Sequence, residues 1–366
     1  MRHYCTLFDI NYLARGLALI ASLERHSPPF TLHILCLDES THRYFTSHPS
    51  PRIRAISLAE LEAGDAELLR AKENRSRIEY YFTLSPTLPL RLLHWHPEID
   101  QITYLDADLY FFSDPEPIFS EMGNRSILII GHRFPSHLNE RERYGIYNVG
   151  FLSFRRDANG LSCLEWWRER CNQWCYDLVE ADRFADQKYL DHWPEKFPGV
   201  CVLRQAGAGL APWNLLGYTI TANRSGLRID GDPLIFYHFH NFGLIARWLV
   251  DPGISFYWNC PIPQLILKEL FLPYLLELRR ILRKEPAAKN IVLPRYKSRF
   301  SHPLVNLSLP PPKLLYFAQQ LRPVPTILTV LFWQIAMQSS KRVITRCFRK
   351  SFNFLAAPFR RISRKS

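Results

Sequence analysis

The sequence TYLDADLYFF, at residues 103–112, places two aspartates between two apolar runs. A buried carboxylate is costly, and two carboxylates two residues apart repel each other. Because residues i and i+2 of a strand project to the same side, Asp106 and Asp108 converge where this strand ends. A divalent cation is the simplest means of stabilising such a pair. The alternative is that Asp106 caps a turn and Asp108 caps the next short helix.

Strand and helix patterns alternate on both sides of this stretch. Residues 11–26 and 159–179 are predicted to form helices, and residues 52–98 are interpreted as helices with Pro86 and Pro89 near the start of one. Strands are expected at residues 3–9, 30–38, 101–108, 126–134, 147–155, 200–205 and 233–240. The pattern predicts an α/β fold with a mixed, mostly parallel sheet and helices on both faces.

Polar residues stand at the ends of other predicted strands. His238 and His240 lie two residues apart at the end of a late strand, where one imidazole could bind a metal and the other a phosphate. The alternative is that both histidines pack among the surrounding aromatic residues and bind no ligand. Asn148 and Gly150 begin another strand, where a glycine would let a ligand approach the backbone.

Two more segments carry polar residues in apolar surroundings. Asp186 and Gln187 begin a short predicted helix, where the alternative role of Asp186 is to complement the helix dipole. Thr6, Asp9 and Tyr12 surround the end of the first strand, which is where a doubly wound fold meets its nucleotide.

Taken in order, the motifs T-x-x-D-x-x-Y, Y-L-D-A-D, N-x-G, D-Q and H-F resemble those of a GT-A-fold glycosyltransferase. The chain is most similar to the retaining family-8 type, which includes glycogenin and the bacterial lipopolysaccharide galactosyltransferases. The resemblance spans residues 3–245 and rests on five motifs in the same order.

The resemblance implies a role for each matching residue. Asp106, Asp108 and His238 would hold manganese or magnesium on the diphosphate of a nucleotide-sugar. The catalytic residues implied beside the reacting sugars are Asp186, Gln187 and Asn148. The residues implied at the nucleotide-sugar are Thr6, Asp9, Tyr12, Arg77 and His240.

The sequence departs from the family pattern in two places. The Lys-Pro-Trp motif that grips the diphosphate is absent, and His240 or Arg247 is a candidate to replace its lysine. The donor-binding basic residue near positions 75–91 matches Arg77 in an unusual context, with Glu79 and Thr83 as weaker candidates. Whether His238 or His240 binds the metal stays open.

We therefore expect a metal-dependent hexosyltransferase that uses a nucleotide-diphospho-sugar, with a UDP-sugar as the first expectation. The resemblance implies retention and a role in glycan or envelope polysaccharide synthesis, with a glycan, lipid-linked or protein acceptor. Two alternatives remain. One is a nucleotidyltransferase or phosphatase that uses the same acidic pair, and the other is a non-catalytic protein that binds membranes or nucleic acid.

Charge divides the chain near residue 260. Residues 261–366 contain 20 Lys and Arg against 3 Asp and Glu, whereas residues 1–260 have a net charge of −5. We therefore expect a glycosyltransferase domain at residues 1–258 and a Pro-rich, basic, amphipathic helical extension at residues 259–366. Nine Lys and Arg with no acid follow residue 340, among apolar residues that are typical of an interfacial helix. This pattern predicts peripheral attachment to an anionic membrane surface, and no nucleic acid partner.

Cysteine usage and the first residues bear on the compartment. The eight cysteines are scattered and form no zinc-type pair, as expected in a reducing cytosol. The first residues enter a strand pattern with no apolar signal-peptide region. Together with the basic extension, these features predict a cytoplasmic protein at the inner face of the membrane.

Overall fold

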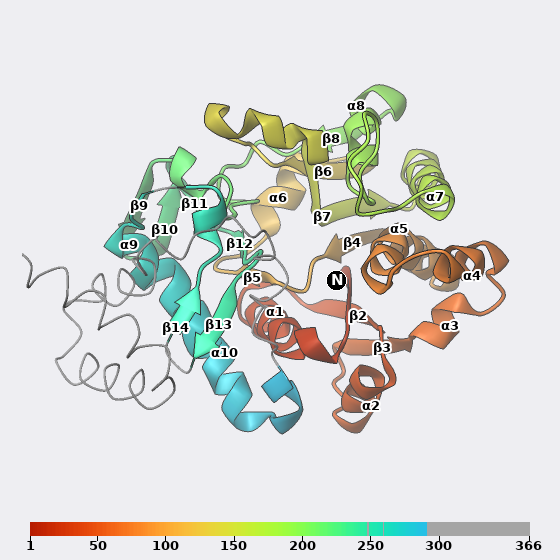
Figure 1. Ribbon diagram of the computed structural model, residues 1–366, viewed down its shortest axis with the longest axis horizontal. Helices are drawn as coiled ribbons and strands as arrows, with labels where there is room; N and C mark the ends of the chain where they lie inside the picture. Colours follow the sequence, from red (N-terminus) through yellow and green to blue (C-terminus); the bar gives the residue numbers. More distant parts are fainter. Residues whose placement is uncertain (247–248, 259, 291–366) are drawn as a thin grey trace, which may run out of the picture. The chain divides into compact units, whose positions relative to one another are not determined.

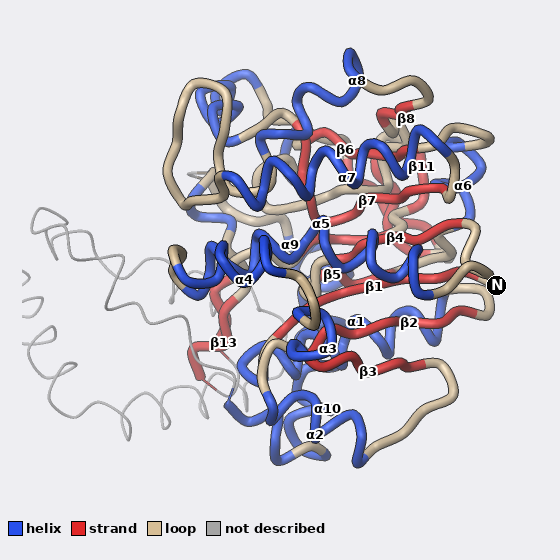
Figure 2. Tube along the Cα trace, turned by 90° about the vertical axis from the view of Figure 1, so that its right-hand side faces the viewer, coloured by secondary structure: helices blue, strands red, loops and turns tan. Residues whose placement is uncertain are grey.

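The computed structural model describes residues 1–246, 249–258 and 260–290. Its centre is a seven-stranded sheet in the order β3-β2-β1-β4-β7-β6-β8, and Figure 2 shows the strands one above another in this order. The strands are β1 (Arg2–Phe8), β2 (Phe30–Cys36), β3 (Ile53–Ser57), β4 (Gln101–Leu105), β6 (Ile127–Gly131), β7 (Tyr147–Arg155) and β8 (Val200–Val202). Only β7 runs antiparallel to its neighbours β4 and β6, so the predicted mixed, mostly parallel sheet is confirmed.

Helices cover both faces of this sheet (Figure 1). The α-helices are α1 (Leu13–His26), α2 (Glu39–Ser47), α3 (Leu58–Glu62), α4 (Ala66–Glu73), α5 (Arg77–Trp95), α6 (Glu116–Met122), α7 (Ala158–Gln173), α8 (Trp193–Lys196), α9 (Gln264–Ile266) and α10 (Leu272–Lys284). Shorter 3-10 turns are η1 (Ile10–Tyr12), η2 (Ser136–Tyr144), η3 (Lys188–His192), η4 (Leu215–Gly217), η5 (Ile254–Phe256) and η7 (Pro286–Asn290), and η6 (Leu267–Phe271) is a π-helix.

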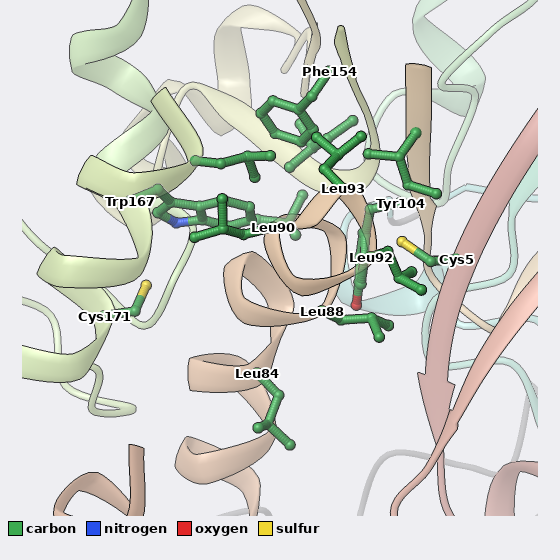
Figure 3. Packing of buried hydrophobic residues seen from close by; sticks show 14 of the residues in the cluster. Cys5, Leu84, Leu88, Leu90, Leu92, Leu93, Tyr104, Phe154, Trp167 and Cys171 are labelled. Carbon is green, nitrogen blue, oxygen red and sulfur yellow. The ribbon is translucent and has the colours of Figure 1, made fainter. Parts of the chain in front are cut away.

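The core on one face lies between α5, α7 and the sheet (Figure 3). Leu84, Leu88 and Leu92 recur every four residues along α5, which places them on one side of the helix. All three are fully buried, as is Trp167 of α7. Burying one leucine side chain contributes about 2 kcal/mol, so this stripe anchors α5 on the sheet.

On the opposite face, α1 lies close to the sheet. A Cβ atom built on Gly16 would lie 2.4 Å from the ring of Phe8 in β1, so only glycine permits this approach. Phe8 and Cys5 are on opposite sides of β1, because side chains alternate along a strand. Cys5 belongs to the α5 core, which shows that α1 and α5 cover different faces.

The interpretation of residues 52–98 as helices was wrong in two details. Residues 53–57 form β3, which pairs with β2 along its whole length. Pro86 and Pro89 lie in the interior of α5, because the helix begins at Arg77 behind a capping box made by Ser76 and Glu79.

Smaller strands extend the structure beyond the main sheet. They are β5 (Leu109–Phe111), β9 (Ile220–Asn223), β10 (Gly226–Ile229), β11 (Asp232–Pro233), β12 (Phe236–His238), β13 (Gly243–Ala246) and β14 (Leu249–Asp251). β5 pairs antiparallel with β12, and His238 is opposite Leu109. This register places the histidine segment directly beside the acidic pair, although some 130 residues separate them along the chain.

The helices that follow residue 260 pack against this same unit. Helix α10 contacts α1, the Tyr274 ring stacks on Phe239 at 3.6 Å, and Glu277 forms ion pairs with Arg25 and Arg280. These contacts do not show whether residues 1–258 fold alone, so the predicted domain boundary stays a prediction. The basic segment after residue 340 and Arg247 lie outside the described residues. In the part of the chain that the structure describes, no helix is both long enough and apolar enough to cross a membrane.

Candidate functional site

The acidic pair lies at the carboxyl end of β4. The Asp106 amide donates to the Gly150 carbonyl of β7 at 2.9 Å, and the Leu109 amide donates to the Asp106 carbonyl at 3.2 Å. The chain therefore turns sharply after β4, and the Asp108 carbonyl accepts a hydrogen bond from the Phe239 amide at 2.9 Å. These backbone bonds bring both aspartates against the end of β12.

His238 contacts both carboxylates. Its Nε2 lies 3.0 Å from Asp108 Oδ1 and 3.6 Å from Asp106 Oδ2. Asp108, His238 and His240 each offer a ligand atom, and these three atoms lie within 4.8 Å of one another. The structure thus brings both histidines to the acidic pair, where the sequence left open which of them would bind a metal. Carboxylate oxygens and imidazole nitrogens together suit a divalent cation such as manganese.

The charges of this cluster depend on one another. Burial raises the pKa of Asp106, and the nearby charge of Asp108 adds to that rise. Burial alone would also raise the pKa of Asp108, but the charge of His238 and its hydrogen bond outweigh burial and lower it. Burial would lower the pKa of His238, and the same contact with Asp108 raises it instead. A bound cation would balance the two carboxylates and leave both imidazoles neutral.

Asn148 connects this cluster to the segment that carries Gln187. Its amide nitrogen donates to Gln187 Oε1 at 3.2 Å, and its Oδ1 accepts from the Gly150 amide at 2.9 Å. Gln187 Nε2 in turn donates to the Tyr144 carbonyl at 3.0 Å. The two amide side chains are therefore held in fixed orientations next to the acidic pair.

Gly150 lies where the two sets of side chains meet. A Cβ atom at this position would lie 2.7 Å from Asn148 Oδ1, 3.0 Å from His238 Cε1 and 3.1 Å from Asp106 Oδ2. The sequence suggested that this glycine would let a ligand approach the backbone. In the structure the space is taken by side chains of the site itself.

Asp186 is buried behind the acidic pair. Burial raises its pKa to about 7, and the charge of Asp106 adds to the rise. Its carbonyl accepts a hydrogen bond from Trp167 Nε1 at 2.8 Å, which fixes its backbone to α7. The preceding residue, Ala185, has a φ of +46°, a strained conformation for a residue with a side chain. Strain of this kind persists where the surrounding structure enforces it, often at functional sites.

Of the residues predicted at the nucleotide-sugar, His240 lies in the Asp108 cluster, and the other four lie near the carboxyl end of β1 and the start of α5. Arg77 Nη2 lies 2.7 Å from Asp9 Oδ2, and Asp9 caps η1 through the Asn11 amide. Thr6 is fully buried, and its hydroxyl has no partner among the described residues. Tyr12 is 43% exposed, and the Arg15 guanidinium lies over its ring, 4.6 Å from the ring centre.

The two weaker candidates have structural contacts. Glu79 completes the cap of α5 and accepts a hydrogen bond from the Asp177 amide at 3.0 Å. The Thr83 hydroxyl is buried and accepts a hydrogen bond from Arg75 at 2.9 Å. Glu79 therefore ties the start of α5 to the segment that leads to Asp186, and Thr83 orients Arg75, which donates to the Asn172 carbonyl of α7 at 2.8 Å.

Sequence reasoning missed two residues of the site. His132 Nε2 lies 3.3 Å from the Asn148 amide nitrogen, and its Nδ1 faces the Ile146 carbonyl at 3.2 Å. His132 follows β6 directly, so a polar residue after a predicted strand could have revealed it. The Trp213 ring lies against both His238 and His240, with centroids 5.5 and 5.6 Å away. It comes from a loop that carries no motif.

The chain is similar to two curated proteins of Bacillus subtilis strain 168. The uncharacterized protein YfnF is 36% identical over 251 residues, which are 66% of this chain and 82% of that protein. The uncharacterized protein YfnD is 31% identical over 281 residues, which are 76% of this chain and 89% of that protein. No established family model matches the chain.

Solved structures with a glycosyltransferase name are also similar to the chain. The galactosyltransferase LgtC, with donor and acceptor sugar analogues, is 17% identical with a TM-score of 0.45, covering 76% of this chain and 95% of that one. Mouse xyloside xylosyltransferase 1 is 16% identical with a TM-score of 0.41, covering 66% and 98%. The glycosyltransferase GlyE of Streptococcus pneumoniae TIGR4 is 13% identical with a TM-score of 0.45, covering 77% and 63%.

Proposed function

We propose that this chain, which belongs to the family of the Bacillus subtilis proteins YfnF and YfnD, is a metal-dependent glycosyltransferase. The observation that supports this function most is the convergence of Asp106, Asp108, His238 and His240 at the carboxyl end of β4. Ligands of open α/β sheets bind beyond the carboxyl ends of the strands. A set of two carboxylates and two imidazoles at that edge, with Asp108 and His238 buried, suits a divalent cation with a phosphate ligand.

The donor in this proposal is a nucleotide-diphospho-sugar, with a UDP-sugar as the first expectation. A divalent cation held at the site would supply positive charge to balance the charge that develops on the leaving diphosphate. Asp106, Asp108 and His238 would hold that cation, and His240 lies close enough to join them or to face a phosphate oxygen. Tyr12, with its exposed ring, would stack against the base, and the Arg77–Asp9 pair would contact the nucleoside.

The reacting sugars would lie against Asn148, Gln187 and Asp186. Asn148 and Gln187 are oriented by their hydrogen bonds to each other and to the backbone, so they can position sugar hydroxyls without reorganisation. A charged Asp186 would stabilise positive charge at the anomeric carbon, and its burial strengthens that interaction. The motif resemblance favours retention of anomeric configuration. In an inverting enzyme the same carboxylate would be a candidate general base.

The first experiment is donor hydrolysis by the full chain with UDP-, GDP- and ADP-sugars, in manganese and in EDTA. We expect manganese-dependent release of one nucleoside diphosphate, and a loss of about a hundredfold or more in Asp108→Asn. Asp114→Asn is the matched control, because this exposed carboxylate lies six residues further along the chain and caps only the Glu116 amide.

Each other function predicts a different product. A phosphatase would release inorganic phosphate, and a nucleotidyltransferase would release or consume pyrophosphate. If no sugar nucleotide is cleaved and none raises the melting temperature in manganese, the glycosyltransferase proposal fails. The acceptor can be sought among glycans, lipid-linked sugars and proteins once the donor is known, and the anomer of the product then decides between retention and inversion.

A further inference from the structure

A cavity lies at the edge of the sheet opposite the acidic pair. It has a volume of about 790 Å³ and lies at the amino ends of β1, β2 and β4, beside the connection from α5 to β4. Its lining includes His3, His33, His96 and Glu98, together with Trp95 at the end of α5. Nothing in the proposed reaction uses these residues.

Three histidines from three elements gather at this cavity. His3 comes from β1, His33 from β2 and His96 from the end of α5. The His33 ring centre lies 6.1 Å from that of His3 and 5.4 Å from that of His96. Two imidazoles on one tetrahedral zinc ion have ring centres about 5 Å apart, given zinc–nitrogen bonds of about 2.0 Å. The two distances from His33 are therefore close to that between two imidazoles on a shared metal.

His33 is the member that packing alone does not explain. Its side chain is 4% exposed, and neither ring nitrogen has a hydrogen-bond partner among the described residues. His3 Nδ1 is likewise buried without a partner in that part of the chain. Buried polar atoms are normally satisfied, so these nitrogens indicate a ligand in the cavity. Burial lowers the pKa of His33 to about 3, which keeps the imidazole neutral and its lone pair available.

His96 is oriented by a carboxylate. Its Nδ1 lies 3.2 Å from Glu98 Oε1, which leaves Nε2 free to face a ligand. Histidines that bind metals commonly donate their other ring nitrogen to a carboxylate, which fixes the ring and makes it a stronger ligand.

Charges of both signs line the cavity, so the imidazoles and not the net charge point to a cation. Glu60, Glu98 and Asp100 also line the cavity, which adds three carboxylates to the imidazoles. Three arginines and Met1 balance these carboxylates: Arg2 pairs with Glu116, Arg54 donates to the Pro51 and Ile53 carbonyls, and Arg155 donates to the Arg125 and Gly123 carbonyls.

We propose that His3, His33 and His96 form a second divalent metal site, of the zinc type, with Glu98 orienting His96. Among the described residues, Asp108, His238 and His240 form the one group whose three ligand atoms all lie within 4.8 Å of one another. The ring nitrogens of His3, His33 and His96 are farther apart than that. Binding therefore draws the rings together, chiefly by rotation of His96, whose side chain is 40% exposed. A structural metal here would tie the end of α5 to the amino ends of β1 and β2.

The test is titration of the full chain with Co²⁺ alone, followed by visible absorption, in a preparation with no histidine tag and with Cys260→Ser, which removes the exposed thiol of the described residues. We expect about two equivalents of Co²⁺ per chain, and about one after His96→Ala or after Asp108→Asn. The bands lost in these two variants should differ, because three imidazoles and a carboxylate-rich set give different spectra. Glu98→Gln should weaken the His96-dependent equivalent about ten- to a hundredfold.

His96→Ala is the main variant because its side chain is partly exposed and the protein should still fold. Donor hydrolysis in manganese should be unchanged in it, since His96 is not part of the Asp108 cluster. The proposal is overturned if His96→Ala and the parent bind the same amount of Co²⁺ with the same spectrum and affinity. It is also overturned if Asp108→Asn removes all bound Co²⁺.

Discussion

At the scale of single residues, Gly150 allows Asn148 to lie next to the acidic pair and His238. Asn148 Oδ1, His238 Cε1 and Asp106 Oδ2 all lie within about 3 Å of where its Cβ would be. A strand residue in the middle of β7 would ordinarily carry a β-branched side chain. Here the glycine gives that volume to side chains from three segments of the chain.

Gly150→Ala should therefore damage the site while leaving the fold intact. The added methyl group would displace Asn148, His238 or Asp106 by a few tenths of an ångström or more, and small misplacements of this kind cost up to about a hundredfold in rate. Manganese-dependent donor hydrolysis and manganese affinity would be measured. Gly131→Ala is the matched control, since its nearest neighbour would be 3.7 Å away and its φ is not positive. Equal activity in the two variants would contradict this role of Gly150.

Asp186 should make the stability of the protein depend on pH. Its pKa is raised by burial to about 7 in the folded protein and is about 3.9 in the unfolded chain. The folded state therefore binds the proton more tightly, and the stability present below pH 4 is lost as pH rises towards 7. The loss amounts to at most about 4 kcal/mol, given 1.36 kcal/mol for each pKa unit.

Asp186→Asn removes this titration. In EDTA, urea unfolding should show the variant gaining stability relative to the parent between pH 4 and pH 8, and the gain should level off above pH 8. Asp182→Asn is the control, because Asp182 is exposed in the same segment. Parallel stability curves for Asp186→Asn and the parent would show that Asp186 is not held in an apolar environment.

At the scale of elements, the predictable features were those that repeat along the chain. Strands β1, β2 and β6 are apolar runs, and apolar residues recur at helical spacing in α1 and α7, because one or both faces of each element are buried. The existence of these elements was therefore predicted correctly. β3 was missed because it is a five-residue strand at the sheet edge with only one buried side chain. Its identity depends on the backbone of β2, with which it pairs.

Helix α5 shows how a local signal can be outweighed. Pro86 and Pro89 favour a helix start, since proline lacks an amide hydrogen that a first turn does not need. The capping box of Ser76 and Glu79 starts the helix earlier, and the buried leucine stripe holds it past both prolines. Tertiary packing thus offsets the cost of about 3 kcal/mol that an interior proline usually carries.

At the scale of the whole molecule, charge is concentrated at one end of the sequence. Residues 261–366 have 20 basic and 3 acidic side chains, and nine of the basic ones follow residue 340. We propose that this end attaches the protein to an anionic membrane surface, where each Lys or Arg near the surface contributes about 1 kcal/mol. Helix α10 packs against α1, so removing everything after residue 260 would expose apolar surface of the folded unit. Substitution is therefore a better test than truncation.

Replacing the nine Lys and Arg after residue 340 with glutamine should abolish co-sedimentation with vesicles that contain anionic lipid. The unmodified chain should sediment with them, and salt should weaken that association. Zwitterionic vesicles are the control, and donor hydrolysis should be equal in both proteins. Continued sedimentation of the substituted chain with anionic vesicles would exclude this end as the attachment site.

The sequence by itself determined the fold class, the acidic pair at the end of β4 and the order of the polar motifs, because each depends on neighbours along the chain. The tertiary structure decided which of those motifs meet. Pairing of β5 with β12 brings His238 to Asp108, β7 brings Asn148 and Gly150 beside His238 and Asp106, and a loop supplies Trp213. The histidine cluster at the opposite edge likewise draws on three separate elements. Contacts between distant segments depend on strand pairing and packing, and no spacing along one segment encodes them.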